Sequence, residues 1–306
     1  MPTTTATGAV PLAMSASILA WYDRLGRSLP FRGTKDPYLV LVSEVMAQQT
    51  QIGRVGDAWR EFTTTFPSFE RLAAASPADV LRAWRGLGYN RRALNLWRAA
   101  GVVVEAHGGV LPSDVTALER LPGIGPYTAR AVAAIAFGAP VGAVDTNVRR
   151  VLSRSLSGAI DGFSTADLQR VADASVPTDR PADWTHALMD VGATFCRTRK
   201  PDCEACPARR SCRYASEAGS REQAAVVRPA PKARVAASPF RSSSRWLRGR
   251  ILDRLREIDG AEWHDLVAPI GDHDGPAVTR ALSLLAAEGL IELQPGAGLR
   301  ARLPLS

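Results

Sequence analysis

The sequence predicts an all-α protein with a small additional domain at its C-terminal end. Six segments place apolar residues three and four positions apart, which is the spacing of an amphipathic helix. They are ASILAWYDRL, ADVLRAWRGL, RRALNLWRAAGVVVEA, YTARAVAAIAF, NVRRVLSRSL and ADWTHALMDVGATF. Proline and glycine residues separate these segments, and few strand-like alternations occur before residue 285. Helices joined by short turns are therefore expected over most of the chain.

The expected domain boundaries follow from a segment in which this pattern stops. Residues 216–244 are rich in Ala, Pro, Ser and Arg with little periodicity, which is typical of a linker. We therefore expect one domain at 1–215 and a second at 245–306. In the second, RWLRGRILDRLREI is amphipathic, and Pro276 stands near the first position of another helix. IELQPGAGLRARLPL then predicts two short strands, which favours a winged-helix-like domain over a plain helical cap.

Composition sets broad limits on class and location. A chain of 306 residues with 46% hydrophobic residues suits globular domains with substantial cores. No run of about eighteen apolar residues is present, and no basic segment precedes the mildly apolar start. We therefore expect no membrane span, no secretory signal and a cytoplasmic location in which thiols stay reduced.

The positive charge of the chain points toward an anionic partner. The net charge is +8, and nearly all of the positive charge is arginine, because Lys35, Lys200 and Lys232 are the only lysines. Arginine suits bidentate contacts with phosphate, so nucleic acid is one interpretation. An arginine- and alanine-rich proteome gives the same excess, so the charge leaves both interpretations open.

All four cysteines lie in one short stretch, CRTRKPDCEACPARRSC, with the spacing C-x6-C-x2-C-x5-C. A reducing compartment argues against disulfides. Structural zinc sites usually combine two separated C-x2-C pairs, whereas here the single pair Cys203 and Cys206 is flanked by Cys196 and Cys212. One compact loop around a cluster fits this spacing better, and zinc is the alternative.

The segment LPGIG lies between two helical patterns. Its glycines permit a tight turn with positive φ, and Ile124 is placed to anchor the turn in the core. The amides at the start of the next helix can then bind a phosphate without sequence preference. Glycine-containing turns are common between helices, but LPGIG before an alanine-rich helix is typical of the helix-hairpin-helix of DNA-repair proteins. Leu121, Gly123 and Gly125 are therefore candidate DNA-binding residues.

These motifs together resemble those of the helix-hairpin-helix DNA glycosylases that carry an iron–sulfur cluster, and most of all the adenine DNA glycosylases of the MutY type. The resemblance covers roughly residues 15 to 215. It rests on LPFRGTKDPYLVLVSEVMAQQTQ, GLGYNRRALNL, LPGIGPYTARAV, VDTNVRRV, ALMDVGATFC and the four cysteines, in this order. It implies a two-lobed helical glycosylase fold and a [4Fe–4S] cluster ligated by Cys196, Cys203, Cys206 and Cys212.

Two acidic residues fit the chemistry of base excision. Breaking an N-glycosidic bond needs a proton donor near the base and a carboxylate near the cationic sugar. Glu44 lies in the otherwise neutral helix VLVSEVMAQQTQ, where desolvation raises a carboxyl pKa; an acid on the polar face of that helix is the less favoured alternative. Asp145, in AVDTNVRRV, stands at an expected helix N-cap, and the sequence alone favours that structural role. The resemblance implies that Glu44 is the general acid and that Asp145 stabilises the oxocarbenium-like sugar.

The resemblance also implies roles for residues near these acids. Tyr127 corresponds to a tyrosine that hydrogen-bonds near the catalytic aspartate, and Asn147 to an asparagine that positions the attacking water and the acid. Arg27 and Arg32 correspond to residues near the adenine pocket. Bifunctional relatives such as endonuclease III attack the sugar with a lysine at the position of Tyr127. No lysine lies near the hairpin of this chain, so we expect a monofunctional enzyme.

Three further residues are expected at the DNA by the same resemblance. Gln49 and Tyr89 correspond to side chains that wedge into the base stack, which base flipping requires. Thr50 corresponds to a contact with the damaged guanine opposite the target base. Ordinary packing on a helix surface or in the core is the alternative for all three.

The chain departs from the family pattern at three positions and at its C-terminal end. The family usually has Trp at the position of Phe31, Leu at Ala47 and a second aromatic residue at Asn90. The segment after the linker is too short for the Nudix-like domain with which adenine glycosylases read 8-oxoguanine. These departures leave the base preference open.

We expect a monofunctional DNA glycosylase of base excision repair that removes adenine mispaired with 8-oxoguanine or guanine. A thymine or uracil glycosylase on the same scaffold and a non-catalytic iron–sulfur DNA-binding protein are the alternatives. The expected partner is double-stranded DNA containing a mismatch, bound by a monomer associated with the nucleoid. The expected cofactor is the [4Fe–4S] cluster.

Overall fold

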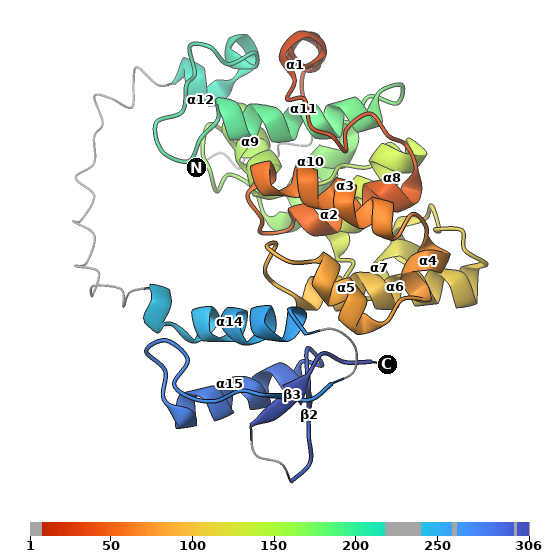
Figure 1. The fold of residues 1–306 in the computed structure, drawn as a ribbon. Coiled ribbons are helices and arrows are strands. Elements are labelled where there is room, and N and C mark those ends of the chain that lie inside the picture. The colour runs from red at the N-terminus through yellow and green to blue at the C-terminus, as the bar shows by residue number, and fades with distance from the viewer. Residues whose placement is uncertain (1–7, 218–239, 259–261, 297–298, 306) are drawn as a thin grey trace. The chain divides into compact units, whose positions relative to one another are not determined.

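The computed structural model describes residues 8–217, 240–258, 262–296 and 299–305. Helices dominate these residues, as predicted, and their strands all lie toward the C-terminus (Figure 1). The chain forms two compact units, one built from Met1–Glu44 with Pro112–Arg228 and the other from Val45–Leu111 with Pro229–Ser306. Each unit thus joins segments that are far apart in the sequence. Within the described ranges, no helix combines the length and the hydropathy that crossing a membrane requires.

The first unit is helical. Its elements are α1 (Leu12–Leu25), the larger part of α2 (Pro37–Ala47), α7 (Val115–Glu119), α8 (Pro126–Phe137), α9 (Thr146–Ser157), α10 (Thr165–Ala174), α11 (Pro181–Thr194), η2 (Arg209–Ser211) and α12 (Arg213–Ser216). The predicted hairpin lies between α7 and α8, and the cysteine loop follows α11.

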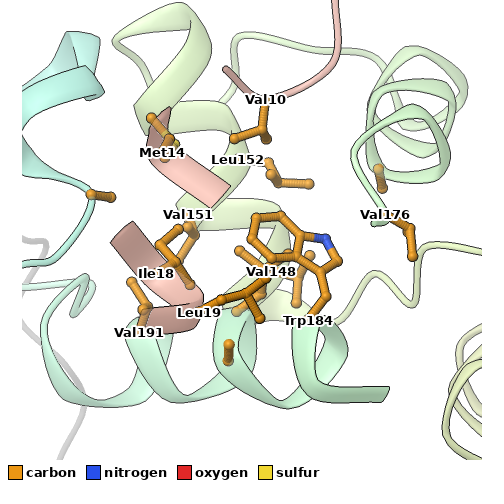
Figure 2. Packing of buried hydrophobic residues seen from close by; sticks show 14 of the residues in the cluster. Val10, Met14, Ile18, Leu19, Val148, Val151, Leu152, Val176, Trp184 and Val191 are labelled. Atoms are coloured by element: carbon orange, nitrogen blue, oxygen red, sulfur yellow. The ribbon is translucent and has the colours of Figure 1, made fainter. Parts of the chain in front are cut away.

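The core of this unit is a cluster of apolar side chains from α1, α9 and α11 (Figure 2). On each helix these residues follow a spacing of three or four positions, with adjacent pairs at Ile18–Leu19 and Val151–Leu152, so they form one apolar side of the helix. They include Met14, Ile18 and Leu19 on α1, Val148, Val151 and Leu152 on α9, and Trp184, Leu188 and Val191 on α11. Phe195, Cys196 and Cys206 pack against the same cluster, so the cysteine loop is attached to the core.

Helix ends in this unit have clear causes in the sequence. The side chains of Asp145 and Ser164 accept hydrogen bonds from backbone amides in the first turns of α9 and α10. Pro126 and Pro181 occupy the starts of α8 and α11, where their missing amides cost no hydrogen bond. Gly158 ends α9 with a φ of 77°, which glycine adopts at little cost.

The second unit contains helices and a small sheet. Its elements are η1 (Ile52–Arg54), α3 (Val55–Thr65), α4 (Phe69–Ala73), α5 (Pro77–Ala83), α6 (Arg91–His107), η3 (Phe240–Ser242), α14 (Ser244–Arg256), β1 (His264–Asp265), α15 (Gly275–Ala287), β2 (Glu292–Leu293) and β3 (Arg300–Arg302). Helix α6 packs on α4 and α5. The rings of Phe62 and Trp84, 5.7 Å apart and edge to face, join α3 to the end of α5.

Among the described residues, the C-terminal part of this unit contains η3, α14 and α15 and three short strands, and the winged-helix-like domain stays a prediction. Helices α14 and α15 pack side by side (Figure 1). The strand order is β1–β3–β2, all antiparallel, with His264 opposite Ala301 and Glu292 opposite Arg302. Strands β2 and β3 are the predicted hairpin. Strand β1 was not predicted, because two exposed residues carry no alternating pattern.

Most of the predicted linker lies outside the described residues, namely 218–239 of residues 216–244. Helix α12 ends at Ser216, and α14 begins at Ser244. The domain boundaries at 215 and 245 remain a prediction. The compact units divide the chain differently, because residues 45–111 group with the C-terminal segment.

Candidate active site

Glu44, on α2, is a buried acid. Glu44 is 9% exposed, and its neighbours on the same helix, Ser43 and Val45, are also buried. Burial raises the pKa of Glu44 to about 7. The hydrogen bond from Tyr127 and the charge of Arg32 oppose this rise, whereas the charge of Asp145 adds to it. Near neutral pH the carboxyl therefore carries a proton for a large part of the time.

Asp145 is the N-cap of α9 and also faces the site. Its Oδ1 accepts from the backbone amide of Val148 at 2.6 Å, which is the capping bond. Its Oδ2 accepts from Nδ2 of Asn147 at 3.0 Å. Because the charge of Asp145 raises the pKa of Glu44, the two carboxyls are close enough to interact. Asp145 therefore has the helix-capping role that the sequence alone favoured. The cap uses Oδ1, and the hydrogen bond to Oδ2 comes from the side-chain amide of Asn147.

Tyr127 lies in the first turn of α8, directly after the hairpin. Its hydroxyl lies 3.1 Å from Oε2 of Glu44 and 3.7 Å from Sδ of Met189. Burial and the charges of Glu44 and Asp145 raise the pKa of Tyr127 well above its usual value, so the hydroxyl keeps its proton. The resemblance implies a hydrogen bond near the catalytic aspartate; in the structure the Tyr127 hydroxyl bonds to Glu44, which itself interacts with Asp145.

Arg27 and Arg32 meet at Asp190 of α11, an acid that the sequence analysis missed. Asp190 is 0% exposed. Arg32 donates to both of its oxygens, at 2.6 and 2.7 Å, and Arg27 donates from its backbone amide at 2.9 Å and from Nε at 2.6 Å. Burial alone raises the pKa of Asp190, but the hydrogen bonds and charges of the two arginines outweigh it and hold the pKa below its ordinary value. Asp190 thus fixes both arginines.

A chain of hydrogen bonds joins Asp145 to the cysteine loop. Oδ1 of Asn147 accepts from Nη2 of Arg150 at 2.7 Å, and Nε of Arg150 donates to the carbonyl oxygen of Cys196. Nη2 of Arg150 also donates to the carbonyl oxygen of Gly192 at 2.8 Å. A Cβ on Gly192 would lie 2.5 Å from Cβ of Asn147, so glycine is needed for the close approach of α11 to α9.

The four cysteines are free thiols that line one small cavity together with Phe195, Arg154 and Tyr214. Nη1 of Arg154 lies 3.5 Å from Sγ of Cys196, and its guanidinium lies over the ring of Tyr214 at 4.8 Å. Burial raises the pKa of the Cys206 thiol to about 12. In the part of the chain that the structure describes, no three His, Cys, Asp or Glu side chains are arranged as ligands of a single metal ion.

The hairpin has the tight turn that the sequence predicts. Gly123 has a φ of 76°, and Ile124 is buried as expected. Leu121 is also buried, so its side chain belongs to the core and not to the surface. Gly125 is extended rather than left-handed, with a φ of −93°, and caps α8. A Cβ at Gly125 would meet no atom within 4 Å, so its missing side chain leaves open space before the helix.

In the second unit, Gln49 and Tyr89 share an unusual backbone conformation. Their φ angles are 53° and 46°, in the left-handed region that costs a non-glycine residue of order 1–3 kcal/mol. Arg92 of α6, which the sequence analysis did not single out, holds both turns. It donates to Gln48 O at 2.5 Å and to Gly88 O at 3.1 Å, as well as to Val45 O, Met46 O and Leu87 O. The side chains of Gln49 and Tyr89 are left exposed.

Thr50 has a structural partner, because its hydroxyl accepts from Nη2 of Arg92 at 3.0 Å. Asn90, one of the departures from the family pattern, also has one. Its Oδ1 accepts from Nη2 of Arg256 on α14 at 2.6 Å. Arg256 is buried and also donates from Nε to the carbonyl oxygen of Leu81 at 2.8 Å. An aromatic residue at position 90 would lack this acceptor, which gives the departure a physical reason.

Residues 42–162 match the family model described as HhH-GPD superfamily base excision DNA repair protein. An adenine DNA glycosylase of Mycolicibacterium smegmatis is 40% identical over 277 residues, which are 90% of this chain and 91% of that protein. The chain belongs to the adenine DNA glycosylase family. The resemblance on which the sequence analysis relied is therefore confirmed, and the protein is a DNA N-glycosylase of base excision repair.

Solved structures agree with the helix-hairpin-helix glycosylase fold of this family. A thermostable thymine-DNA glycosylase has a TM-score of 0.63 and 32% identity, covering 66% of this chain and 95% of that one. An endonuclease III in a non-covalent DNA complex has a TM-score of 0.58 and 22% identity, covering 67% of this chain and 95% of that one. The second likeness concerns the fold alone.

Proposed function

We propose that this adenine DNA glycosylase is monofunctional and removes adenine mispaired with 8-oxoguanine or guanine from double-stranded DNA. The observation that carries the proposal is the pairing of two unlike carboxyls. Glu44 is buried with a pKa raised to about 7, and Asp145 interacts with it while receiving hydrogen bonds from Val148 and Asn147. A buried carboxyl that holds a proton near neutral pH can serve as an acid, and a second carboxyl beside it can serve as a charge stabiliser.

In the proposed reaction, Glu44 donates its proton to a ring nitrogen of the extruded adenine. The N-glycosidic bond then breaks, and its electron pair leaves with the protonated base. Asp145 stabilises the positive charge that develops on the sugar. A water molecule adds to the anomeric carbon and gives a proton to the Glu44 carboxylate, which restores the acid, so the products are free adenine and an abasic site. Asn147, bonded to Asp145 and Arg150, is placed to hold that water.

The monofunctional outcome follows from the chemistry of Tyr127. A lyase step begins when an amine adds to the sugar to give a Schiff base, and a phenol cannot form one. Among the described residues, the two lysines Lys35 and Lys200 are exposed and lie outside the group formed by Glu44, Tyr127 and Asp145. We therefore expect an intact strand after base release, with no borohydride-trapped complex.

The proposed cofactor is a [4Fe–4S] cluster held by Cys196, Cys203, Cys206 and Cys212. The fit rests on four free thiols around one cavity, on a loop that packs on the core, with Arg154 3.5 Å from the sulfur of Cys196. When bound, the cluster supplies a covalent staple for the loop. Cys203→Ser is expected to lose the brown absorbance and bind DNA more weakly. A colourless, fully active wild type contradicts the cluster proposal.

The proposed DNA contacts are of two kinds. The open space at Gly125 and the turn at Gly123 suit a phosphate at the start of α8. The exposed side chains of Gln49 and Tyr89 suit insertion into the base stack, with Thr50 beside them. In this proposal the protein binds as a monomer to a DNA duplex that contains a mismatch.

The test is base release from duplexes with A:8-oxoguanine, A:G, T:G and U:G pairs, with enzyme in excess over DNA. Adenine release with an intact strand is the expected result. Release of pyrimidines alone would favour the second candidate, a thymine or uracil glycosylase. The likeness to a thymine-DNA glycosylase structure is the observation that supports this candidate. Tight binding without release of any base would indicate a non-catalytic DNA-binding protein.

A further inference from the structure

The turns of Gln49 and Tyr89 line an open cavity of about 730 Å³ in the second unit. The C-terminal segment, meaning the part of the chain with η3, α14 and α15, lines its other side. The cavity walls come from the 48–49 and 88–92 turns on one side and from η3, α14 and the end of α15 on the other. Helix α14 thus lines this cavity and is also attached through Arg256 to Asn90.

Two exposed aromatic side chains line this cavity. Tyr89 is 45% exposed and Phe240 is 63% exposed, and both stand among the exposed large apolar residues of the described chain. A third aromatic residue, Trp246, is used internally, because its ring stacks on His273 at 5.9 Å and lies against Gly271. The guanidinium groups of Arg92 and Arg245 lie 5.7 and 4.8 Å from the centre of the Tyr89 ring, so Tyr89 offers a ligand only the part of its ring that stays exposed, whereas Phe240 is the more open of the two.

The charge of the cavity is strongly positive. Five arginines line it, Arg91, Arg92, Arg245, Arg248 and Arg250, against one acid, Glu288, so that the lining carries four net positive charges. Arg248 pairs with Glu288 at 2.5 Å, Arg250 pairs with Asp253, and Arg92 holds the two turns. Within the described ranges, Arg91 and Arg245 have no acidic partner, although the Arg245 guanidinium lies over the ring of Tyr89 at 4.8 Å.

The walls of the cavity are held together by buried polar contacts. Arg256 of α14 donates to Asn90 at 2.6 Å and to Leu81 O at 2.8 Å, and Nη2 of Arg82 donates to Ile258 O at 3.0 Å. Asn90 directly follows Tyr89, so the hydrogen bond from Arg256 holds α14 to the residue next to the exposed ring. The cavity is thus a built feature of this unit.

We propose that this cavity binds a DNA strand, with a phosphate on Arg91 and Arg245 and an unstacked base against Tyr89 and Phe240. Arginine matches phosphate geometry, and any base can stack on an aromatic face. The excess positive charge disfavours an apolar peptide or a cationic ligand. The proposal rests on the proposed function, because the ligand is the DNA of the glycosylase, and it gives the C-terminal segment a part in holding that DNA.

The first test compares two arginines of α14 in the full-length protein. Arg245→Ala removes a cavity arginine, and Arg254→Ala removes an exposed arginine of the same helix that does not line the cavity. Each phosphate contact contributes about 0.9 to the slope of log affinity against log salt. Losing one contact therefore lowers duplex affinity by about eightfold at 0.1 M salt and flattens the slope by about 1. Equal dissociation constants and slopes for the two variants overturn the proposal.

The second test locates the strand directly. DNA with 5-iodouracil placed at positions around the mismatch is irradiated in complex with the wild type, and the cross-linked tryptic peptides are sequenced. Cross-links to the peptides 86–91 and 235–241, which contain Tyr89 and Phe240, are expected, and Phe240→Ala should abolish those of the second peptide. Absence of cross-links to the peptide 235–241 refutes the proposal, because the wedge role proposed for Tyr89 already predicts cross-links to 86–91. Base release by the wild type, measured separately, tells whether the proposed function has failed as well.

Discussion

Substituting Glu44 by Gln tests the raised pKa of this carboxyl through stability and activity together. The rise in pKa from an ordinary 4.5 to about 7 is caused mainly by burial. At 1.36 kcal/mol per pKa unit, it corresponds to about 3 kcal/mol of unfolding free energy. Because the folded-state pKa is the higher one, this stability is fully present below pH 4.5 and is lost as the pH rises through 7.

Glutamine does not ionise, so Glu44→Gln should escape this loss. We expect the difference in unfolding free energy between the variant and the wild type to shift by about 3 kcal/mol in favour of the variant between pH 4.5 and pH 8. Urea denaturation of both proteins across that range measures it. The same variant should bind DNA while losing base release by orders of magnitude. A pH-independent difference in stability would refute the assignment of a buried, raised-pKa carboxyl.

The wild-type rate gives a second readout of the same carboxyl. With a pKa of about 7, Glu44 is about 90% protonated at pH 6 and about 10% at pH 8, so single-turnover base release should fall by about ninefold. The Tyr127 hydrogen bond lowers this pKa, so Tyr127→Phe should move the fall in rate to higher pH. A rate that rises between pH 6 and pH 8 would contradict the role of Glu44 as an acid.

Three other substitutions have definite expected outcomes. Gly192→Ala forces a Cβ to within 2.5 Å of Asn147, so it should cost about 1–3 kcal/mol of stability and slow base release. In the control Gly101→Ala the new Cβ meets no atom within 4 Å, so this variant should be neutral or stabilising. Asp190→Asn unpairs a buried arginine cluster and should cost about 3 kcal/mol in urea denaturation; a change below 1 kcal/mol speaks against it. Asn90→Tyr removes the acceptor of Arg256 and should cost about 1–3 kcal/mol by the same measurement, more than Arg85→Ala, which breaks only an exposed ion pair.

The fold class and the burial of Glu44 could be predicted because both depend on local patterns. Apolar residues three and four apart mark the helices, and a lone acid in VLVSEVMAQQTQ marks a buried carboxyl. Asp190 in ADWTHALMDVGATF also lies between apolar residues, but that segment holds a second acid, Asp183, and Asp190 was not singled out. Its partners Arg27 and Arg32 lie in a distant segment, so the ion pairs themselves carry no local pattern.

Two other features could not be read from the sequence, because they depend on long-range geometry. Arg92 bonds to carbonyl oxygens of two turns, and backbone acceptors leave no trace in residue identity. Asn90 and Arg256 are 166 positions apart, so their hydrogen bond could not be anticipated from either segment.

The clamp of Arg92 on two turns has a consequence for how fast damage can be interrogated. The left-handed backbone at Gln49 and Tyr89 owes its shape to bonds within the protein, so it is established when the chain folds. An encounter with a duplex then needs no search through loop conformations before the two side chains are presented. If Gln49 and Tyr89 enter the base stack as proposed, we expect the opening of the DNA helix, and not a rearrangement of these two turns, to limit the inspection of each base pair.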